Sequence, residues 1–401
     1  MTTHKAPPAR LLDLTRSLRR AGRVATGVDR VELAYLRRFL QDDVPCFGLL
    51  RTALGYVLLE RQGLEGFLAR LEGRTPWGRV NVLSRLARSR PDAVQRAESD
   101  VRRLALTRSW RSALPGMLRR EFPNGFDYFN VGHSNLTDRV LGAIKSAGGN
   151  IHVLIHDVIP LEYPEFQRAG SVKTFEAKLR RVSARADRII YNSKDTRDRT
   201  ERYLDAMGRV PPGVVAYLGT ELPRPDISAL PQGLPPKGPY FVTVGTLEPR
   251  KNHAFLLDLW EEIGPAAPPL FLCGSRGWNN DALFARLDAL DVGHPVQELS
   301  GLDDKALAAL VQGSAGTLFP SLAEGFGLPP LEAIQLGSRV LCNDLEVLRE
   351  FLGENAVYAS VSDRYLWIDM LNQWTEKPVG AGTKTLFVGP DWDEHFKTVL
   401  R

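Results

Sequence analysis

The sequence predicts an α/β protein made of two doubly wound parallel-sheet domains that face each other across a cleft. After residue 240, short apolar segments alternate with helical patterns, which is typical of parallel strands joined by helices. A similar but less regular alternation precedes residue 220, and a proline-rich stretch separates the two halves. The length of 401 residues, with 43% hydrophobic and 25% charged residues, fits two or three globular domains.

The domain boundaries follow from the proline-rich stretch. We expect a first domain over 1–220, a linker over 221–239 and a second domain over 240–385. Prolines crowd the linker, and they oppose both helix and central strand. Within the first domain, residues 61–120 are predicted to be an arginine-rich helical insertion. Residues 386–401 are predicted to contain an amphipathic helix that packs back on the first domain.

The expected elements can be placed from their apolar patterns. In the first domain we expect a helix over 29–40 and strands at 11–14, 44–49, 128–131, 151–155 and 188–191. In the second domain we expect strands at 240–245, 270–273, 316–319 and 339–342, and helices at 254–263, 281–290, 305–311 and 331–336. Ligands of such folds bind at the carboxyl ends of the parallel strands, so residues that directly follow the strands are the candidates for function.

The charge is distributed unevenly. Residues 1–220 carry 38 basic and 23 acidic side chains, whereas 221–401 carry 14 basic and 24 acidic ones. The 14 basic residues of 61–120 are all arginines. Such a surface could contact an anionic membrane, an anionic glycolipid or nucleic acid, or it could be a solvated helical surface, and these interpretations stay open. No aromatic stacking platform accompanies the arginines, so no nucleic-acid partner is expected.

The cysteines and the apolar segments indicate the cellular compartment of the protein. Cys46, Cys273 and Cys342 lie far apart without metal-ligand spacing, which indicates a reducing compartment and no zinc site. The N-terminal residues do not resemble a secretory signal, and the most apolar segment, 44–59, is too short to span a bilayer. We expect a cytoplasmic protein that could lie peripherally at the inner face of the membrane.

The segment 318–337 carries two glutamates on either side of a proline pair. Glu324 and Glu332 would lie on one side of a continuous helix, but Pro329 and Pro330 exclude that helix. Pro330 suits the first turn of a helix that contains Glu332, and Glu324 then belongs to the preceding loop. The N–H groups of a helix N-terminus attract phosphate, and carboxylates accept hydrogen bonds from paired hydroxyls. One glutamate alone would be ordinary; the whole arrangement favours a binding site.

A pair of cations follows the first strand of the second domain. Arg250 and Lys251 precede a helix that Asn252 could cap. Two adjacent cations at the carboxyl end of a strand could bind a diphosphate, the arginine through its planar fork and the lysine as a point charge. An isolated pair of this kind is usually a solvated turn, but the nearby second anion site favours binding.

Several residues of the first domain follow strand ends or enter the first long helix. His156 and Asp157 directly follow a hydrophobic strand, and His133 follows another strand end as a weaker candidate. Gly27 and Arg30 lie where a tight turn enters the helix expected at 29–40. We expect His156 at the edge of the cleft, and Asp157, His133 and Arg30 on the acceptor side. Gly27 is equally well interpreted as a turn glycine without ligand contact.

Several common motifs are missing from the chain. It has no GxGxxG after a strand and no GxxxxGK[ST], so dinucleotide and P-loop sites lose support. It has no HExxH and no GxSxG, which disfavours zinc-protease and α/β-hydrolase chemistry.

The residues named above resemble those of a known family, the retaining nucleotide-sugar glycosyltransferases of family 4 (group 1). Glu324 and Glu332 match its paired-glutamate motif in the form EGFGLPPLE, and 245–252 resembles its GTLEPRKN segment. Residues 156–164 resemble the HDxxPxxYP element of mannosyltransferase-like members, and the similarity otherwise runs from about 240 to 358. The resemblance implies the GT-B fold, in which two Rossmann-like domains face each other across a cleft.

The resemblance also implies roles for individual residues. Arg250 and Lys251 would hold the donor diphosphate, Glu332 the ribose hydroxyls and Glu324 the hydroxyls of the donor sugar. His156 would line the donor sugar from the opposite domain. The further donor-binding residues are expected to be Gly325, Phe326, Gly327, Leu328, Gly245, Thr246 and Gly27. No metal and no cofactor are expected, because the family typically works without a metal and no acidic cluster of the DxD type ends a strand.

We therefore expect a retaining hexosyltransferase that uses a nucleotide-diphosphate sugar and a glycan or lipid-linked acceptor. GDP-mannose as donor is suggested by the HDVIPLEYP element alone. A nucleotide-sugar epimerase or hydrolase of the same fold stays an alternative. So does a basic module that binds membranes or nucleic acid and whose active site has decayed.

Overall fold

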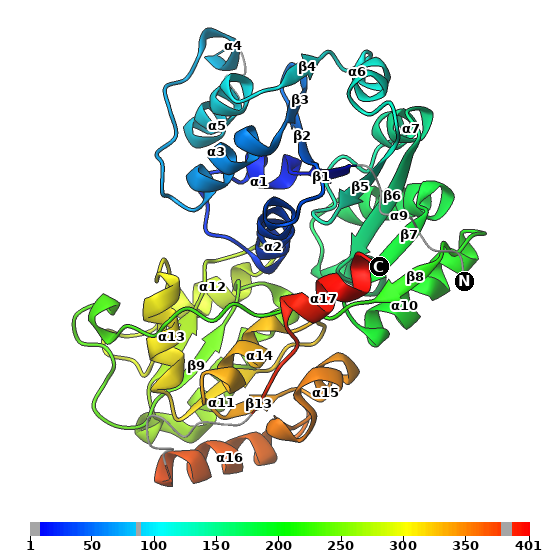
Figure 1. Cartoon of the computed structure of the whole chain (residues 1–401). Coiled ribbons are helices and arrows are strands. Elements are labelled where there is room, and N and C mark those ends of the chain that lie inside the picture. The colour runs from blue at the N-terminus through cyan, green and yellow to red at the C-terminus, as the bar shows by residue number, and fades with distance from the viewer. Residues whose placement is uncertain (1–8, 86–89, 378–386) are drawn as a thin grey trace.

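The computed structural model describes residues 9–85, 90–377 and 387–401, which form two α/β domains (Figure 1). The first domain occupies the upper part of the view and the second the lower part. Each domain contains one sheet with helices packed against it. The expected α/β class with two doubly wound domains is confirmed.

The first domain is built on an eight-stranded sheet. Its strands are β1 Arg10–Asp13, β2 Cys46–Thr52, β3 Gly55–Leu59, β4 Thr107–Ser109, β5 Phe126–Asn130, β6 Gly149–Ile155, β7 Arg188–Tyr191 and β8 Gly213–Val215. Its helices are α1 Thr15–Arg19, α2 Gly27–Gln41, α3 Arg61–Leu71, α4 Val82–Arg85, α5 Asp92–Arg103, α6 Leu114–Glu121, α7 Asp138–Ser146, α8 Ile159–Glu162, α9 Ser171–Arg185 and α10 Lys194–Ala206. The strand order is β4-β3-β2-β1-β5-β6-β7-β8.

At one edge, this sheet differs from the parallel sheet that the sequence predicted. The sheet is not purely parallel, because β3 runs antiparallel to both β2 and β4. Only two residues separate Thr52 from Gly55, and such a short connection permits a hairpin but no parallel crossover. Residues 61–120 are likewise not only helical, since β4 extends the sheet at its edge. Alternating apolar residues in a three-residue edge strand are too few to be recognised in the sequence.

The second domain is built on a six-stranded parallel sheet. Its strands are β9 Phe241–Val244, β10 Leu270–Cys273, β11 Val296–Leu299, β12 Gly316–Phe319, β13 Val340–Cys342 and β14 Val357–Tyr358, in the order β11-β10-β9-β12-β13-β14. Its helices are α11 His253–Ile263, α12 Asp281–Asp288, α13 Asp304–Gln312, α14 Leu328–Gln335, α15 Glu346–Leu352 and α16 Arg364–Glu376. Short 3₁₀ turns are η1 Pro164–Phe166 in the first domain, η2 Ile227–Ala229 between the two sheets, and η3 Pro249–Lys251, η4 Gly264–Ala266 and η5 Gly353–Asn355 in the second domain.

The helix α14 begins three residues earlier than expected. Gly327 precedes it with a φ of 100°, a left-handed conformation that favours glycine. Pro329 and Pro330 then lie in the first turn, where the missing N–H of proline breaks no helical hydrogen bond. Glu332 is therefore inside the helix, and Glu324 lies in the loop between β12 and α14.

The last helix, α17 Trp392–Val399, packs on the first domain (Figure 1). Its His395 Nε2 lies 2.8 Å from the Tyr35 hydroxyl of α2. Arg188 at the start of β7 donates to the carbonyl of Val399 at 2.9 Å. The domain boundary expected at 385/386 lies outside the described residues.

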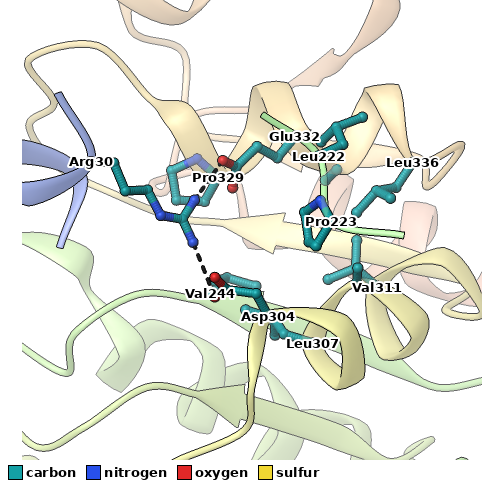
Figure 2. Close-up of a pocket in the computed structure, with 12 residues that line it drawn as sticks. Arg30, Leu222, Pro223, Val244, Asp304, Leu307, Val311, Pro329, Glu332 and Leu336 are labelled. Carbon is teal, nitrogen blue, oxygen red and sulfur yellow. Dashed lines mark hydrogen bonds and ion pairs between the residues drawn. The ribbon is translucent and has the colours of Figure 1, made fainter. Parts of the chain in front are cut away.

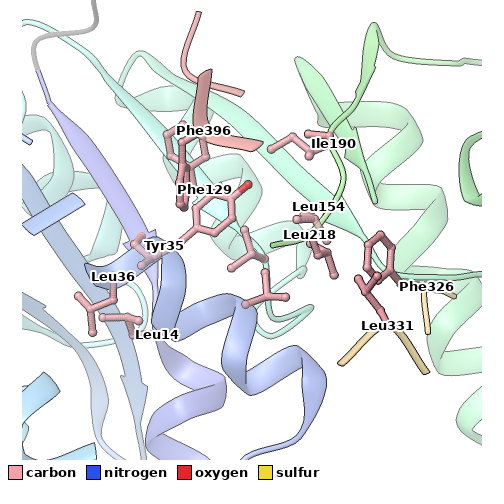
Figure 3. Packing of buried hydrophobic residues seen from close by; sticks show 14 of the residues in the cluster. Leu14, Tyr35, Leu36, Phe129, Leu154, Ile190, Leu218, Phe326, Leu331 and Phe396 are labelled. Atoms are coloured by element: carbon pink, nitrogen blue, oxygen red, sulfur yellow. The ribbon is translucent and has the colours of Figure 1, made fainter. Parts of the chain in front are cut away.

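A buried apolar cluster includes residues of both domains (Figure 3). Tyr35 of α2 packs edge-on against Phe396 of α17, with ring centroids 4.9 Å apart. Phe326 and Leu331, from the loop and helix that carry the two glutamates, belong to the same cluster. Burial of apolar side chains from both sides stabilises the docking of the second domain on the first.

Candidate functional site

Arg250 and Lys251 both contact Glu324. The cations lie in η3, directly after β9, and the glutamate lies in the loop after β12, the strand next to β9 in the sheet. Arg250 Nη1 is 2.8 Å from Glu324 Oε2, and Lys251 Nζ is bonded to Glu324 Oε1. Arg250 Nε is also 2.6 Å from Glu248 Oε1. The structure thus brings together three residues that the sequence assigned to one site.

The electrostatics of this cluster keep Glu324 ionised. Burial by itself would raise the pKa of Glu324, but the charges of Lys251 and Arg250 outweigh burial and lower the pKa to about 2. The carboxylates of Glu324 and Glu248 raise the pKa of Arg250 although burial opposes this. Two cations are offset by two carboxylates in a buried space, so an incoming anion must displace a carboxylate to reach the cations.

Gly245 and Thr246 complete the turn after β9. Gly245 has a φ of 150°, which favours glycine, and a Cβ at this position would lie 3.4 Å from Lys251 Cε. The side chain of Thr246 lies next to Gly277, where a Cβ would come within 2.9 Å of Thr246 Cγ2. Gly245 therefore lies beside Lys251, whereas Thr246 lies beside Gly277.

The loop after Glu324 touches the first domain. A Cβ added to Gly325 would collide with the carbonyl oxygen of His156 and lie 2.8 Å from Asp157 Cβ, so only glycine permits this approach. Thr196 of α10 also donates its hydroxyl to the carbonyl of Gly325 at 2.9 Å. The side chain of Phe326 packs on Phe351 in the core, with centroids 4.0 Å apart, which leaves only its backbone near the site.

His156 is a neutral, oriented imidazole. Its Nε2 lies 2.6 Å from the carbonyl oxygen of Val131, which only accepts, so Nε2 carries the proton. Burial lowers the pKa of His156 to about 4. Asn192 donates to the His156 carbonyl at 2.9 Å and holds the backbone in place.

Asp157 and His133 lie beside His156. Burial raises the pKa of Asp157, an effect that the charge of Arg250 opposes. One carboxylate oxygen of Asp157 accepts from the N–H of Ile159 at 3.1 Å. The His133 ring is 5.2 Å from the His156 ring, and burial, together with His156, lowers the pKa of His133 to about 3. Asp157 and His133, which were expected on the acceptor side, thus lie next to His156.

Glu332 lines a pocket between the domains (Figure 2). Arg30 of α2 reaches across, with Nη1 2.7 Å from Glu332 Oε1 and Nη2 3.3 Å from Asp304 Oδ1. Burial raises the pKa of Glu332, whereas Arg30 lowers it. The other lining side chains are mostly apolar: Leu222, Pro223, Val244, Leu307, Ala308, Val311, Pro329, Ala333 and Leu336.

Gly27 and Leu328 meet at the same interface. Gly27 is the first residue of α2, and a Cβ added to it would lie 3.5 Å from Leu328 Cδ1, at the start of α14. The N-termini of α2 and α14 therefore approach each other from opposite domains. This helix approach was not expected from the sequence, which left Gly27 undecided.

Three partners in the site were missed by the sequence interpretation. Glu248 stands two residues before Arg250. The alternation of acidic and basic residues in this turn was the sequence feature that could have indicated their ion pair. Asp304 and Thr196 reach the site only through the arrangement of the two domains, and their local sequence carries no signal. Arg30 was expected on the acceptor side, but the structure pairs it with Glu332.

The described ranges contain neither a candidate metal site nor a candidate membrane span. There, no three His, Cys, Asp or Glu side chains are grouped as metal ligands would be. Among the same residues, no helix combines the length and the apolar character needed to cross a bilayer. The three cysteines are buried and unpaired.

The chain is similar in sequence to known glycosyltransferases. Residues 229–376 match the family described as Glycosyl transferases group 1. The chain is 32% identical over 244 residues to the serotype-specific mannosyltransferase WbdA of Escherichia coli, a match that covers 55% of this chain and 29% of WbdA. It is 29% identical over 216 residues to the O-antigen chain mannosyltransferase B of Escherichia coli, covering 52% of this chain and 56% of that protein.

Solved structures with very different sequences share the fold. Anabaena Alr3699/HepE in complex with UDP and glucose superposes with a TM-score of 0.61 at 15% identity, over 98% of this chain and 95% of that chain. Sucrose-phosphate synthase from Thermosynechococcus elongatus gives a TM-score of 0.51 at 18% identity, over 67% of this chain and 70% of the other. Residues 229–376 thus resemble the glycosyl transferases of group 1, part of the chain is similar in sequence to mannosyltransferases, and the whole chain has the GT-B fold.

Proposed function

We propose that the protein transfers a hexose, with retention of configuration and without a metal, from a nucleotide-diphosphate sugar to a glycan or lipid-linked acceptor. The observation that carries the proposal is the position of Glu324, which is held between Arg250 and Lys251 and lies in the loop that touches His156 of the other domain. Two cations, a carboxylate and a buried histidine at the meeting point of two sheets suit a sugar bound through a diphosphate.

Donor binding would begin with an exchange of partners. The diphosphate would replace the carboxylate of Glu324 on Arg250 and Lys251, because phosphate oxygens carry more negative charge and suit the arginine fork. The displaced Glu324 would then accept hydrogen bonds from the donor sugar hydroxyls. The N-terminus of α14, which begins at Leu328, would add its free N–H groups to the phosphate site.

The nucleoside would occupy the pocket beside Glu332. The pocket measures only about 30 Å³ in this structure, so the base would enter its apolar part, and the ribose hydroxyls would bond Glu332, only after Arg30 and Asp304 move apart. Arg30 would then share Glu332 with the ribose or move away from it. Mannose as the donor sugar is supported by the mannosyltransferases that resemble the chain, and the complex of HepE with UDP supports a nucleotide in this fold.

The chemical step would depend on stabilising the leaving group. As the bond to the sugar breaks, negative charge grows on the diphosphate, and Arg250 and Lys251 would neutralise it in a buried site. This role replaces the one that a metal has in other transferases. We favour front-face attack over a covalent intermediate, because Asp157 is held by the N–H of Ile159 and Glu324 serves the sugar hydroxyls.

A screen followed by turnover tests the proposal. Nucleoside diphosphates and their sugars, with GDP-mannose among them, are screened by thermal shift, because a ligand that binds only the folded state raises the melting temperature. We expect stabilisation by at least one of them and transfer to an acceptor glycan. No stabilisation by any of them would contradict the proposal.

The alternatives give different results in the same assays. A nucleotide-sugar hydrolase or epimerase would release free sugar or an altered donor without any acceptor. A basic module with a decayed site would bind anionic vesicles or DNA with a steep salt dependence and turn over no nucleotide sugar.

A further inference from the structure

The start of α10 in the first domain contacts the loop of the second domain that carries Glu324. Thr196 of α10 donates its hydroxyl to the carbonyl oxygen of Gly325 at 2.9 Å. Arg199, three residues further along the helix, lies with Nη1 3.5 Å from the carbonyl oxygen of Glu324. Because residues three apart share one face of a helix, α10 presents both donors to two consecutive carbonyl groups of the other domain.

The same segment also holds the backbone of His156. Asn192, which directly precedes the N-cap of α10, donates its side-chain N–H to the carbonyl oxygen of His156 at 2.9 Å. That carbonyl oxygen faces Gly325, where an added Cβ would lie 2.3 Å from it. Residues 192–199 therefore contact the backbone of both residues proposed to line the donor sugar, His156 in the first domain and Glu324 in the second.

Two carboxylates of the first domain orient Arg199. Its Nε lies 2.8 Å from Glu162 Oε2 of α8, its Nη2 is bonded to the same oxygen, and its Nη1 lies 3.0 Å from Asp195 Oδ2. Burial lowers the pKa of Arg199, but the hydrogen bonds and charges of Glu162 and Asp195 outweigh burial and raise it. Because the guanidinium is planar, the contacts with Glu162 also set the direction of Nη1 toward the Glu324 carbonyl.

The second domain holds the following residue of the loop. Phe326 packs on Phe351 of α15, with ring centroids 4.0 Å apart. Glu350 of the same helix accepts hydrogen bonds from the backbone N–H groups of Lys194 and Asp195 at 2.7 and 3.1 Å. A carboxylate is stabilised at this place because the N–H groups of a helix N-terminus are free and the helix dipole is positive there. The loop is therefore held by both α10 and α15, and these two helices also bind each other.

We propose that Thr196 and Arg199 are positioning residues, which keep the backbone at 324–325 in place while the Glu324 side chain exchanges its partners. This inference rests on the proposed function, in which the donor diphosphate replaces the Glu324 carboxylate on the two cations. The displaced carboxylate reaches the sugar hydroxyls only if its backbone stays in place, because such hydrogen bonds need oxygen–oxygen distances of about 2.5–3.0 Å. A misplacement of about 1 Å in a site of this kind can cost about 100-fold in rate.

Substitutions at Thr196 test the hydroxyl without disturbing the ion pairs of Arg199. Thr196→Val keeps the size of the side chain but removes its donor, whereas Thr196→Ser keeps the donor. The control is Thr200→Val, one turn further along α10, because the buried hydroxyl of Thr200 has no hydrogen-bond partner among the described residues. Arg199 is left intact, since its loss would leave Glu162 and Asp195 without their cation.

Hydrogen exchange of the full chain without ligand measures how firmly the loop is held. The N–H groups of Leu322 and Leu331, on either side of the loop, donate to the carbonyl oxygens of Arg250 and Gly327 at 2.7 and 3.3 Å. We expect peptides with these N–H groups to exchange at least threefold faster in the valine variant than in the wild type, the serine variant and the control. Peptides of α16 should exchange equally in all four proteins, because only a general loss of stability would affect them.

Calorimetry separates the sugar from the rest of the donor. GDP and GDP-mannose are titrated into the same four proteins. We expect the valine variant to bind GDP within twofold of the wild type, because Arg250 and Lys251 are intact, and to bind GDP-mannose at least tenfold more weakly. The serine variant and the control should bind both ligands like the wild type. A merely structural role of Thr196 would weaken the binding of both ligands alike.

The outcomes that overturn the proposal differ from those that contradict the proposed function. Unchanged exchange of the loop, or unchanged affinity for GDP-mannose, in the valine variant overturns the proposal. So does a loss of affinity that is equal for GDP and GDP-mannose, or equal in the valine and serine variants. A wild type that binds neither ligand contradicts the proposed donor instead, and hydrogen exchange then still decides whether Thr196 holds the loop.

Discussion

Arg30 and Glu332 form an ion pair between the two domains, with 2.7 Å between Nη1 and Oε1. The arginine comes from the start of α2 and the glutamate from α14 of the other domain, and their side chains meet at the pocket (Figure 2). Because Glu332 is also the residue proposed to hold the ribose, donor binding and contact between the domains share one carboxylate. The pair therefore links occupation of the pocket to the relative position of the domains.

Substitution Arg30→Gln tests this link. The variant removes the charge that bridges Glu332 and Asp304. We expect kcat/KM for the donor to fall about tenfold, because Glu332, the carboxylate proposed to bind the ribose, loses the partner that positions it. Steady-state kinetics measure the effect. The matched control is Arg37→Gln, on the same helix, whose partners Glu72 and Glu221 lie outside the pocket. Equal kinetics of wild type and Arg30→Gln would contradict the role.

Substitution Glu324→Gln should separate binding from turnover. The variant removes the carboxylate that competes for Arg250 and Lys251, so a nucleoside diphosphate without sugar should bind at least as tightly as to the wild type. Transfer should fall by a factor of 100 or more, because the donor sugar loses an ionised partner. Calorimetry and a turnover assay measure the two effects. Glu261→Gln, which removes an exposed carboxylate paired with Arg286, is the control. Normal turnover by Glu324→Gln would count decisively against the site.

Loss of either donor-site cation should weaken nucleotide binding. In Arg250→Ala and Lys251→Ala we expect the affinity for a nucleoside diphosphate to fall about tenfold or more, since a charge-assisted hydrogen bond to phosphate contributes about 1.5–3 kcal/mol. Calorimetry measures the affinities. Arg286→Ala, which removes a cation of α12 paired with Asp258 and Glu261, should bind like the wild type. Unchanged affinity in both site variants would remove their assigned role.

Stability should fall in mild acid because of buried neutral histidines. Burial lowers the pKa of His156 to about 4 in the folded protein, whereas an unfolded histidine has a pKa of about 6.5. Between these values the unfolded chain binds a proton that the folded one does not, so the free energy of unfolding decreases as the pH falls from about 6.5 to about 4. His156→Gln should reduce this decrease by up to about 3 kcal/mol. Denaturant unfolding at several pH values measures it, and identical slopes would contradict the assignment.

The sequence alone was sufficient to predict which charged residues of the second domain lie together. The strands at 270–273 and 316–319 have the predicted bounds, and residues after parallel strands must meet at one sheet edge. Arg250, Lys251 and Glu324 therefore had to be neighbours. Pro329 and Pro330 also placed Glu332 in a helix and Glu324 in a loop, because proline acts on the local backbone regardless of the rest of the fold.

Only the tertiary structure decided which charges meet across the chain. Arg30 and Glu332 are 302 residues apart, and Tyr35 and His395, whose side chains are bonded at 2.8 Å, are 360 residues apart. The edge of the first sheet likewise depends on β4, which pairs with β3 from about fifty residues further along the chain. Local propensity describes the conformation of a segment, whereas ion pairs and cation clusters depend on how segments pack, and that packing is set by the burial of apolar surface over the whole molecule.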